Sequence, residues 1–398
     1  MTNARLAGSA AVCALLLATS PAVADSRLGA EVGVNAGYTS NPFGANTNNA
    51  GAATLAGTFS PTLTILSPTG STSLTGSVTH TEYARLYDGT TDYSVGASTN
   101  QQVSATTSLT GRVGYSSQVR NSLYPIADPI TGLPNNPNAP VIVDPSGALS
   151  FAERIETISG NVGITTALSA RDTISLSGQV TSAIFPTTSV AARSYDVYGG
   201  SASYMRRISA NTSVGLGLNV ARSDYRRTAL GDTTQISPSA ILQTKLNSRL
   251  SLRVAAGLTF SNIDLVTGKR YNTAFYGNGN LCYEGLRSSL CADASQSVSP
   301  TATSGTSTVT SFGAAYSYKL TARSNISARL SYSTAKTLDL LGNGKSDFGQ
   351  ASLSYSRQIT ERLSGVISAS YSDTFNSNAS LNASFYGTVG IRYRLGTL

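Results

Sequence analysis

Apolar and polar residues alternate along most of the chain, and residues 319–333 (KLTARSNISARLSYS) show the pattern clearly. After the polar segment TARSN, every second residue from Ile326 to Tyr332 is apolar, and the residues between them are polar. A period of two is typical of a β-strand with one apolar face and one polar face. We therefore predict an extended strand here and wherever the same pattern returns.

Short polar turns of similar sequence separate these alternating stretches. Most of them have an apolar residue three positions before the centre and another three positions after it, and tyrosines recur at fixed distances from several turns. The connections on the other side of each strand pair vary in length. Seven turns are predicted, one within residues 67–74 and the others centred on Thr106, Arg171, Asn211, Arg249, Arg323 and Arg362.

Tight turns on one side and variable loops on the other predict an all-β fold, a transmembrane antiparallel up-and-down β-barrel of about 16 strands. The turns would be periplasmic and the longer loops extracellular. In hydrocarbon every backbone amide needs a partner, so a membrane-spanning sheet must close on itself. Residues 25–398 form the predicted barrel, with long loops at 121–152 and 264–307.

Some residues do not fit a regular strand. Pro61 and Pro238 fall where a donor to the sheet is expected, which predicts a bulge or a strand end. His80 and Glu82 fall on the face that Leu74 and Val78 would turn to lipid. Either a bulge near Thr79 corrects the register, or the strand extends beyond the membrane.

The composition agrees with a barrel. Only 40% of the 398 residues are hydrophobic and 12% are charged, both below the values of an average soluble domain. A disordered chain would lack the 20 tyrosines present here. Residues 1–24 read as a signal peptide, with Arg5, the apolar run 10–18 and a cleavage site at 22–24. We expect export to a bacterial outer membrane.

Two cysteines remain after the signal peptide, Cys282 and Cys291. Since the chain is exported, we predict that they form a disulfide within the long loop 264–307. A metal site would need further thiol or imidazole ligands, and none lies near them in the sequence.

The predicted interior face is rich in Ser, Thr, Gly, Asn and Gln, and several charged residues share it. They would favour anionic or polar solutes in the pore, or they would simply hydrate the lumen and pair with acidic loop residues. Loop 121–152 either narrows the lumen or lies on the surface. The candidate lumen residues are Arg112, Arg120, Arg253, Arg329, Arg392 and Glu31.

Other kinds of chemistry have little support. His80, with Glu82 two residues later, is the best candidate for a hydrolase site, but a lone His-x-Glu is a weak signal, so we expect no enzyme. No cofactor, metal or nucleic-acid site is indicated. The net charge of +8 is spread along the chain and suits attraction to anionic glycans or lipopolysaccharide. Outer-membrane lipid and lipopolysaccharide are the expected surroundings of the barrel.

Two segments resemble known sequences. Residues 388–395 resemble the C-terminal signal read by the outer-membrane assembly machinery, with Gly390, Tyr393 and Leu395 at the matching positions. The first strand and its loop (GVNAGYTSNPF) resemble the β-barrel porin-2 family. The residues that carry this second resemblance are Tyr38, Asn41, Pro42 and Phe43.

The porin-2 resemblance implies a role in exopolysaccharide production, with polysaccharide or export proteins as partners. The alternation and the turns by themselves imply only a barrel. The expected function is a pore or conduit for polar solutes. The alternatives are a structural or surface-binding barrel without channel activity and, less favoured, an outer-membrane hydrolase.

Overall fold

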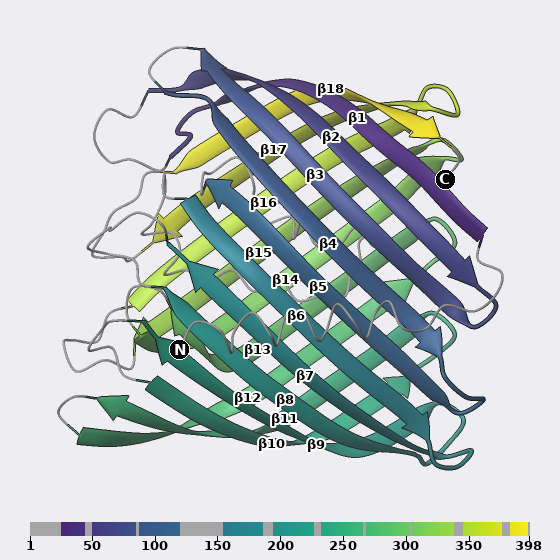
Figure 1. Ribbon diagram of the computed structural model, residues 1–398, viewed down its shortest axis with the longest axis vertical. Helices are drawn as coiled ribbons and strands as arrows, with labels where there is room; N and C mark the ends of the chain where they lie inside the picture. Colours follow the sequence, from purple (N-terminus) through teal and green to yellow (C-terminus); the bar gives the residue numbers. More distant parts are fainter. Residues whose placement is uncertain are drawn as a thin grey trace.

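The protein is a single closed β-barrel. The computed structural model describes residues 25–43, 50–84, 87–119, 154–185, 194–226, 232–265, 268–301, 305–337, 345–375 and 383–396. The predicted signal peptide, loop 121–152 and Arg120 lie outside these residues. In the described part the strands form one antiparallel 18-stranded sheet, in which each strand pairs with the next and β18 pairs with β1. Figure 1 shows the tilted strands, with short turns gathered at the right-hand end.

The strands are 13 to 17 residues long, a few residues more than a tilted strand needs to cross a bilayer. No helix among the described residues is long and apolar enough to cross a membrane. The strands are β1 (Asp25–Thr39), β2 (Ala52–Ser67), β3 (Gly70–Ala84), β4 (Thr90–Gln102), β5 (Thr107–Val119), β6 (Arg154–Ala167), β7 (Asp172–Ile184), β8 (Tyr195–Arg207), β9 (Thr212–Tyr225), β10 (Asp232–Lys245), β11 (Leu250–Leu265), β12 (Gly268–Glu284), β13 (Ser288–Thr301), β14 (Gly305–Thr321), β15 (Ser324–Thr337), β16 (Lys345–Gln358), β17 (Leu363–Phe375) and β18 (Ser384–Gly396).

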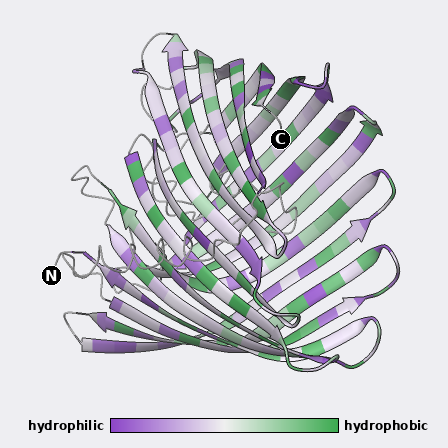
Figure 2. Cartoon of the chain, turned by 45° about the vertical axis from the view of Figure 1, so that its right-hand side comes forward, coloured by the Kyte–Doolittle hydropathy of each residue, from purple (hydrophilic) through white to green (hydrophobic). Residues whose placement is uncertain are grey.

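The two faces of the sheet differ as the alternation predicts. Large apolar side chains point outward and stay exposed, including Leu216 at 67% and Leu330 at 61%. Thr259, on an inward position of β11, is only 1% exposed. Figure 2 shows the resulting interleaving of hydrophobic and hydrophilic positions along the strands. An exposed apolar exterior of this extent suits hydrocarbon and does not suit water.

All seven predicted turns are present, and a side chain closes most of them. Two residues before the predicted centre, a Ser, Thr or Asn accepts hydrogen bonds from backbone N–H groups of the turn. Ser169, for example, accepts from the N–H groups of Arg171 and Asp172. These residue types form such turns readily. The equivalent acceptors elsewhere are Ser104, Ser209, Asn247, Thr321 and Thr360.

The prediction of about 16 strands was wrong, because residues 264–307 do not form a long loop. They contain β12, β13 and an eighth tight turn, Gly285 to Arg287. This turn has Gly285 where the others have Ser, Thr or Asn, and it closes through the backbone, from Gly285 N to Ser288 O. Glu284 also stands where most other turns have an apolar residue. The apolar residue three positions before the centre, which marks most other turns in the sequence, is therefore missing here, although Leu290 stands three positions after Arg287.

The barrel wall is irregular beside this hairpin. Pairing between β12 and β13 ends at Gly277 and Gln296, although both strands continue toward the long-loop end. At that end the hydroxyls of Thr233 on β10 and Thr306 on β14 lie 2.7 Å apart and are buried. The far halves of β11 and β12 thus form a hairpin that pairs with β10 but not with β13.

Both irregular prolines remain within continuous strands. Pro61 in β2 and Pro238 in β10 each interrupt pairing on one side only, and the register resumes unchanged beyond them. No bulge is needed because a glycine lies close to each proline. Gly76 faces Pro61, and Gly257 lies so close to Pro238 that a Cβ there would overlap the Pro238 carbonyl oxygen.

We predict that Gly257→Ala destabilises the barrel by about 1–3 kcal/mol, the usual cost of overpacking. The added methyl group would push β11 away from β10. Thermal unfolding of detergent-solubilised protein, followed by loss of the folded band on unheated gels, measures the effect. Gly57→Ala is the matched control, because nothing lies within 4 Å of a Cβ at Gly57. Equal melting temperatures for the two variants would contradict the prediction.

Candidate functional site

The lumen is lined mainly by hydroxyl groups. Inward Ser and Thr side chains on neighbouring strands pair across the sheet at many levels, with oxygen–oxygen distances of 2.6–3.2 Å. These groups both donate and accept hydrogen bonds, so they can exchange partners with water and with polar solutes. Further pairs are Ser73–Ser98, Thr165–Ser175, Ser177–Ser201, Ser237–Thr259, Ser295–Ser311 and Ser327–Ser354.

Basic side chains outnumber acidic ones at the inward positions that the structure describes. Five predicted lumen residues, Arg112, Arg253, Arg329, Arg392 and Glu31, occupy inward positions, since their neighbours along each strand carry the exposed apolar side chains. Further basic residues at inward positions are Arg27, Arg207, Lys245, Arg270, Lys319 and Arg394. The acidic ones besides Glu31 are Asp25, Asp92, Glu284 and Asp293.

Glu31 neutralises part of this charge at the seam where the barrel closes. Its Oε1 lies 3.7 Å from Nε of Arg392, and its Oε2 lies 3.9 Å from Nε of Arg394. All three side chains are at least one-third exposed, so solvent screens these contacts and each contributes at most about 1 kcal/mol. Their main effect is on the electric field inside the lumen.

A second group of polar residues crosses the wall from β11 to β13. Arg253, Asn280 and Asp293 lie opposite one another on successive strands. Gly313 on β14 leaves room for the Asp293 carboxylate, because a Cβ there would lie 2.6 Å from Oδ1. Sequence reasoning missed Asp293 because its strand was taken for a loop. The alternation from Leu290 to Ala294 was the available signal.

The predicted disulfide is present, but it lies in the barrel wall. Cys282 on β12 and Cys291 on β13 are directly opposite in register, with Cα atoms 4.1 Å apart. Both are buried on the inward face, because Leu281, Tyr283 and Leu290 beside them point outward. The bond therefore links two strands next to the tight turn that closes without a side-chain acceptor.

His80 lies on the outward face of β3 near the long-loop end, and the register on both sides of it is regular. Its Nδ1 lies 2.8 Å from Oγ1 of Thr91, and its Nε2 lies 2.9 Å from Oε1 of Glu82. All three groups are exposed on the outside of the barrel. The pair faces away from the lumen, so it takes no part in lining the pore.

The four residues of the porin-2 resemblance are divided between the two faces. Tyr38 points outward and is 53% exposed. Asn41 and Pro42 are fully buried, and the Phe43 ring lies 5.3 Å from that of Tyr87. The segment 40–43 is held on the start of β18, with the N–H of Ser40 donating to the Phe385 carbonyl at 2.9 Å.

The residues of the predicted assembly signal lie at the seam. Tyr393 and Leu395 point outward and are exposed. Gly390 faces inward opposite Asn35, and a Cβ at Gly390 would overlap the Asn35 side-chain oxygen. Their role in assembly stays a prediction, although this seam does require a glycine at position 390.

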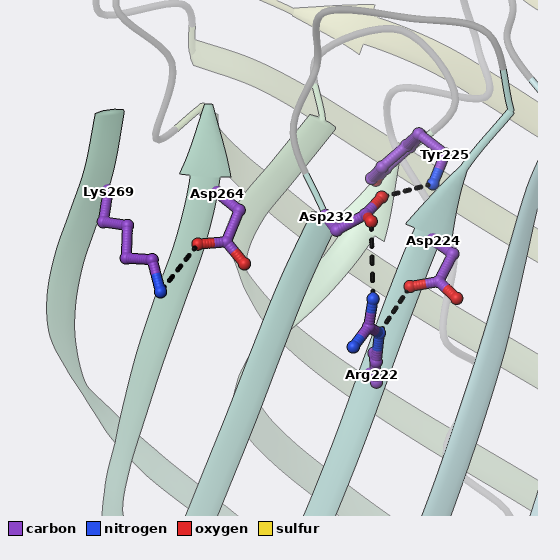
Figure 3. A network of polar contacts seen from close by, with 6 residues as sticks. All are labelled: Arg222, Asp224, Tyr225, Asp232, Asp264 and Lys269. Atoms are coloured by element: carbon purple, nitrogen blue, oxygen red, sulfur yellow. Dashed lines mark hydrogen bonds and ion pairs between the residues drawn. The ribbon is translucent and has the colours of Figure 1, made fainter. Parts of the chain in front are cut away.

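The outward charges mark where the apolar exterior ends. On β9 the outward residues from Val214 to Val220 are apolar, and the next two are Arg222 and Asp224. Arg222 bonds Asp224 at 2.7 Å and Asp232 of β10 at 3.5 Å, as Figure 3 shows. The apolar part of β9 is thus seven residues long, somewhat shorter than the roughly nine to eleven residues that a tilted strand needs to span hydrocarbon.

The described residues contain no group of three or more His, Cys, Asp or Glu side chains placed to hold a metal ion. The candidate site is therefore the lumen itself, with hydroxyl groups along its length and an excess of basic side chains.

No protein-family model matches the sequence, and no curated protein is significantly similar to it. Among solved structures, Pseudomonas aeruginosa OpdQ is 9% identical, with 94% of this chain and 100% of that chain covered and a TM-score of 0.46. A BenF-like porin from Pseudomonas fluorescens Pf-5 is 11% identical (94% and 99% covered, TM-score 0.49). Pseudomonas aeruginosa OprD is 12% identical (94% and 96% covered, TM-score 0.45). Likenesses this distant assign no role to this chain.

We predict that replacing both Cys282 and Cys291 with Ser lowers the free energy of unfolding by about 2–3 kcal/mol, the value expected for a small closed loop. The β12–β13 hairpin should still form, since its backbone ladder is unchanged. Chemical denaturation in detergent measures the loss, and reduction of the native protein should reproduce it. An unchanged denaturation midpoint would show that the ladder alone fixes this hairpin.

Proposed function

We propose that the chain is an outer-membrane pore for polar solutes. The observation that carries this proposal is the division of one closed sheet into an exposed apolar exterior and an interior of hydroxyl and charged groups. Such a barrel crosses a bilayer with every strand paired and leaves a polar path through its centre. No cofactor or catalytic step is needed, since solutes move down their own gradients.

The lumen charges supply a preference for anions. Inward basic residues outnumber acidic ones among the described positions, and low-dielectric walls concentrate their field within the lumen. This supports selection of small anionic solutes over cations. The excess of inward basic residues supports anion selection more strongly than the net charge of the sequence does, because the structure separates inward charges from outward ones.

The more specific assignment to the β-barrel porin-2 family, and with it a link to exopolysaccharide export, is also proposed. It rests on Tyr38, Asn41, Pro42 and Phe43, of which Asn41 and Pro42 are buried and Phe43 is partly buried against Ala52 and Tyr83. Neighbouring genes for polysaccharide synthesis or export would support it. A genome context devoted to nutrient uptake would contradict it and leave the pore unaffected.

A barrel without channel activity is the second candidate. Burial at the long-loop end of the lumen, near β10 and β14, favours this candidate. Inward residues such as Thr233, Thr259 and Ser307 are almost fully buried there, so little open space surrounds them. Single-channel recording in planar bilayers separates the two functions. Stable conductance steps support the pore, and a folded protein that gives none supports a structural or surface-binding barrel.

We predict opposite shifts in ion selectivity for two lumen variants. Glu31→Gln removes a negative charge and should raise the chloride-to-potassium permeability ratio by roughly twofold, while Arg253→Gln should lower it by a similar factor. These factors correspond to about 0.4 kcal/mol, as expected for one partly screened charge. Reversal potentials in a salt gradient give the ratio.

The control for both variants is Lys336→Gln, which removes a positive charge from the outward face of β15. Its permeability ratio should match that of the native protein. If all three variants shift the ratio equally, the inward charges do not set the selectivity.

A further inference from the structure

Basic residues recur at the tight-turn end of the barrel, at one structural position. In each turn, the backbone carbonyl of the last residue accepts a hydrogen bond from a backbone N–H group on the second strand after the turn. The turn between β6 and β7 shows this, because Arg207 at the end of β8 donates to Arg171. This bond extends the ladder by one pair and fixes two residues opposite each other at the rim. In three of these pairs both residues are basic: Arg171–Arg207, Arg287–Lys319 and Arg362–Arg394, with N–O distances of 2.8, 2.8 and 2.9 Å.

The strand residues of these pairs occupy inward positions around the mouth of the lumen. Arg207 and Arg394 follow the alternation of β8 and β18, in which Tyr204 and Tyr393 point outward. Lys319 holds the inward position of β14 next to the outward Leu320. The turn residues opposite them lie one pair beyond the last ladder pair, at the same end of the barrel. We call these six residues the basic rim.

Ion pairs neutralise little of the basic rim, although Asp172 lies beside Arg171 and attracts it electrostatically, and Glu361 precedes Arg362. Among the described residues, Arg394 is within 4 Å of a carboxylate, that of Glu31, whereas no ion pair joins the other five to an acidic side chain. An acidic residue does face a turn arginine elsewhere, since Glu284 bonds through its N–H to the carbonyl of Arg249. The chain can therefore place opposite charges at this position and does so once.

Like charges directly opposite each other on paired strands are destabilising. Keeping three such pairs at one end of the lumen therefore favours an anionic ligand that occupies this end. We propose that the basic rim is the docking site for a linear polyanion, an acidic polysaccharide chain, which enters the pore at the tight-turn end. This inference rests on the proposed pore and names the class of solute that binds at its tight-turn end.

The position of the charges favours a threading chain over other anionic partners. Basic side chains continue from the rim into the lumen through Arg392, Arg329 and Arg253, so an extended chain could keep contact as it advances. A folded acidic protein would reach only the rim. Anionic lipid headgroups would need basic residues on the outward face, as at Arg357 on β16.

The experiment measures block of the ionic current by a short oligogalacturonate added to one side of a planar bilayer. We expect block from the tight-turn side, and weaker block as salt is raised. The triple variant Arg171→Gln, Arg287→Gln, Arg362→Gln should raise the half-blocking concentration about tenfold, which corresponds to about 1.4 kcal/mol. Each current is normalised to that variant's own open level.

The matched control is Arg357→Gln, which removes an exposed arginine from the same end but from the outward face. Oligogalacturonate should block the current through this variant as strongly as it blocks the current through the native protein. An uncharged maltodextrin of equal length should block the current through none of the proteins. Equal relief of block by the control, or no relief by the triple variant, would overturn the proposal. Block by polyglutamate but not by oligogalacturonate would overturn it in favour of an acidic protein.

A silent bilayer would refute the proposed pore but would not decide the docking site. Binding of fluorescently labelled oligogalacturonate to the detergent-solubilised barrel, measured by anisotropy, tests the rim without any current. Weaker binding by the triple variant and native binding by Arg357→Gln support the docking site. Equal binding by both variants overturns it.

Discussion

The structure depends on one constraint, the need to pair every backbone N–H and C=O group in a medium that offers no hydrogen bonds. An open sheet would leave two unpaired edges, each group costing several kcal/mol in hydrocarbon. The pairing of β1 with β18 removes both edges. The contact between these two strands also explains why residue 390 is a glycine. A side chain at this inward position would overlap the side chain of Asn35 on β1.

Closure fixes two environments for every strand and so separates charges that the sequence mixes. In the part of the chain that the structure describes, outward charges lie where the apolar exterior ends, as at Arg222 and Asp224 on β9. Inward charges run along the lumen, with Glu31 partly offsetting Arg392 and Arg394. The net charge of +8 is thus less informative than its division between faces. In the proposed pore, a solute would meet the inward, mainly basic set.

Local turn chemistry decides how well the strand count can be predicted. Seven turns were found in the sequence because most of them have an apolar residue three positions before and three positions after the centre, as Leu168 and Ile174 stand around Arg171. The turn at Gly285 has Glu284 at the first of these two positions, so it shows only half of the pattern. The hairpin of β12 and β13 was missed for that reason, and Asp293 was missed along with it.

The sequence by itself determined the fold class, the two faces, seven of the turns and the pairing of Cys282 with Cys291, because each depends on residues near one another in the chain. The tertiary structure alone decided the strand number, the close contact between β10 and β14 at Thr233 and Thr306, and the rows of basic residues around the rim. These depend on which strands become neighbours and on their register, and both are set by closure of the whole sheet.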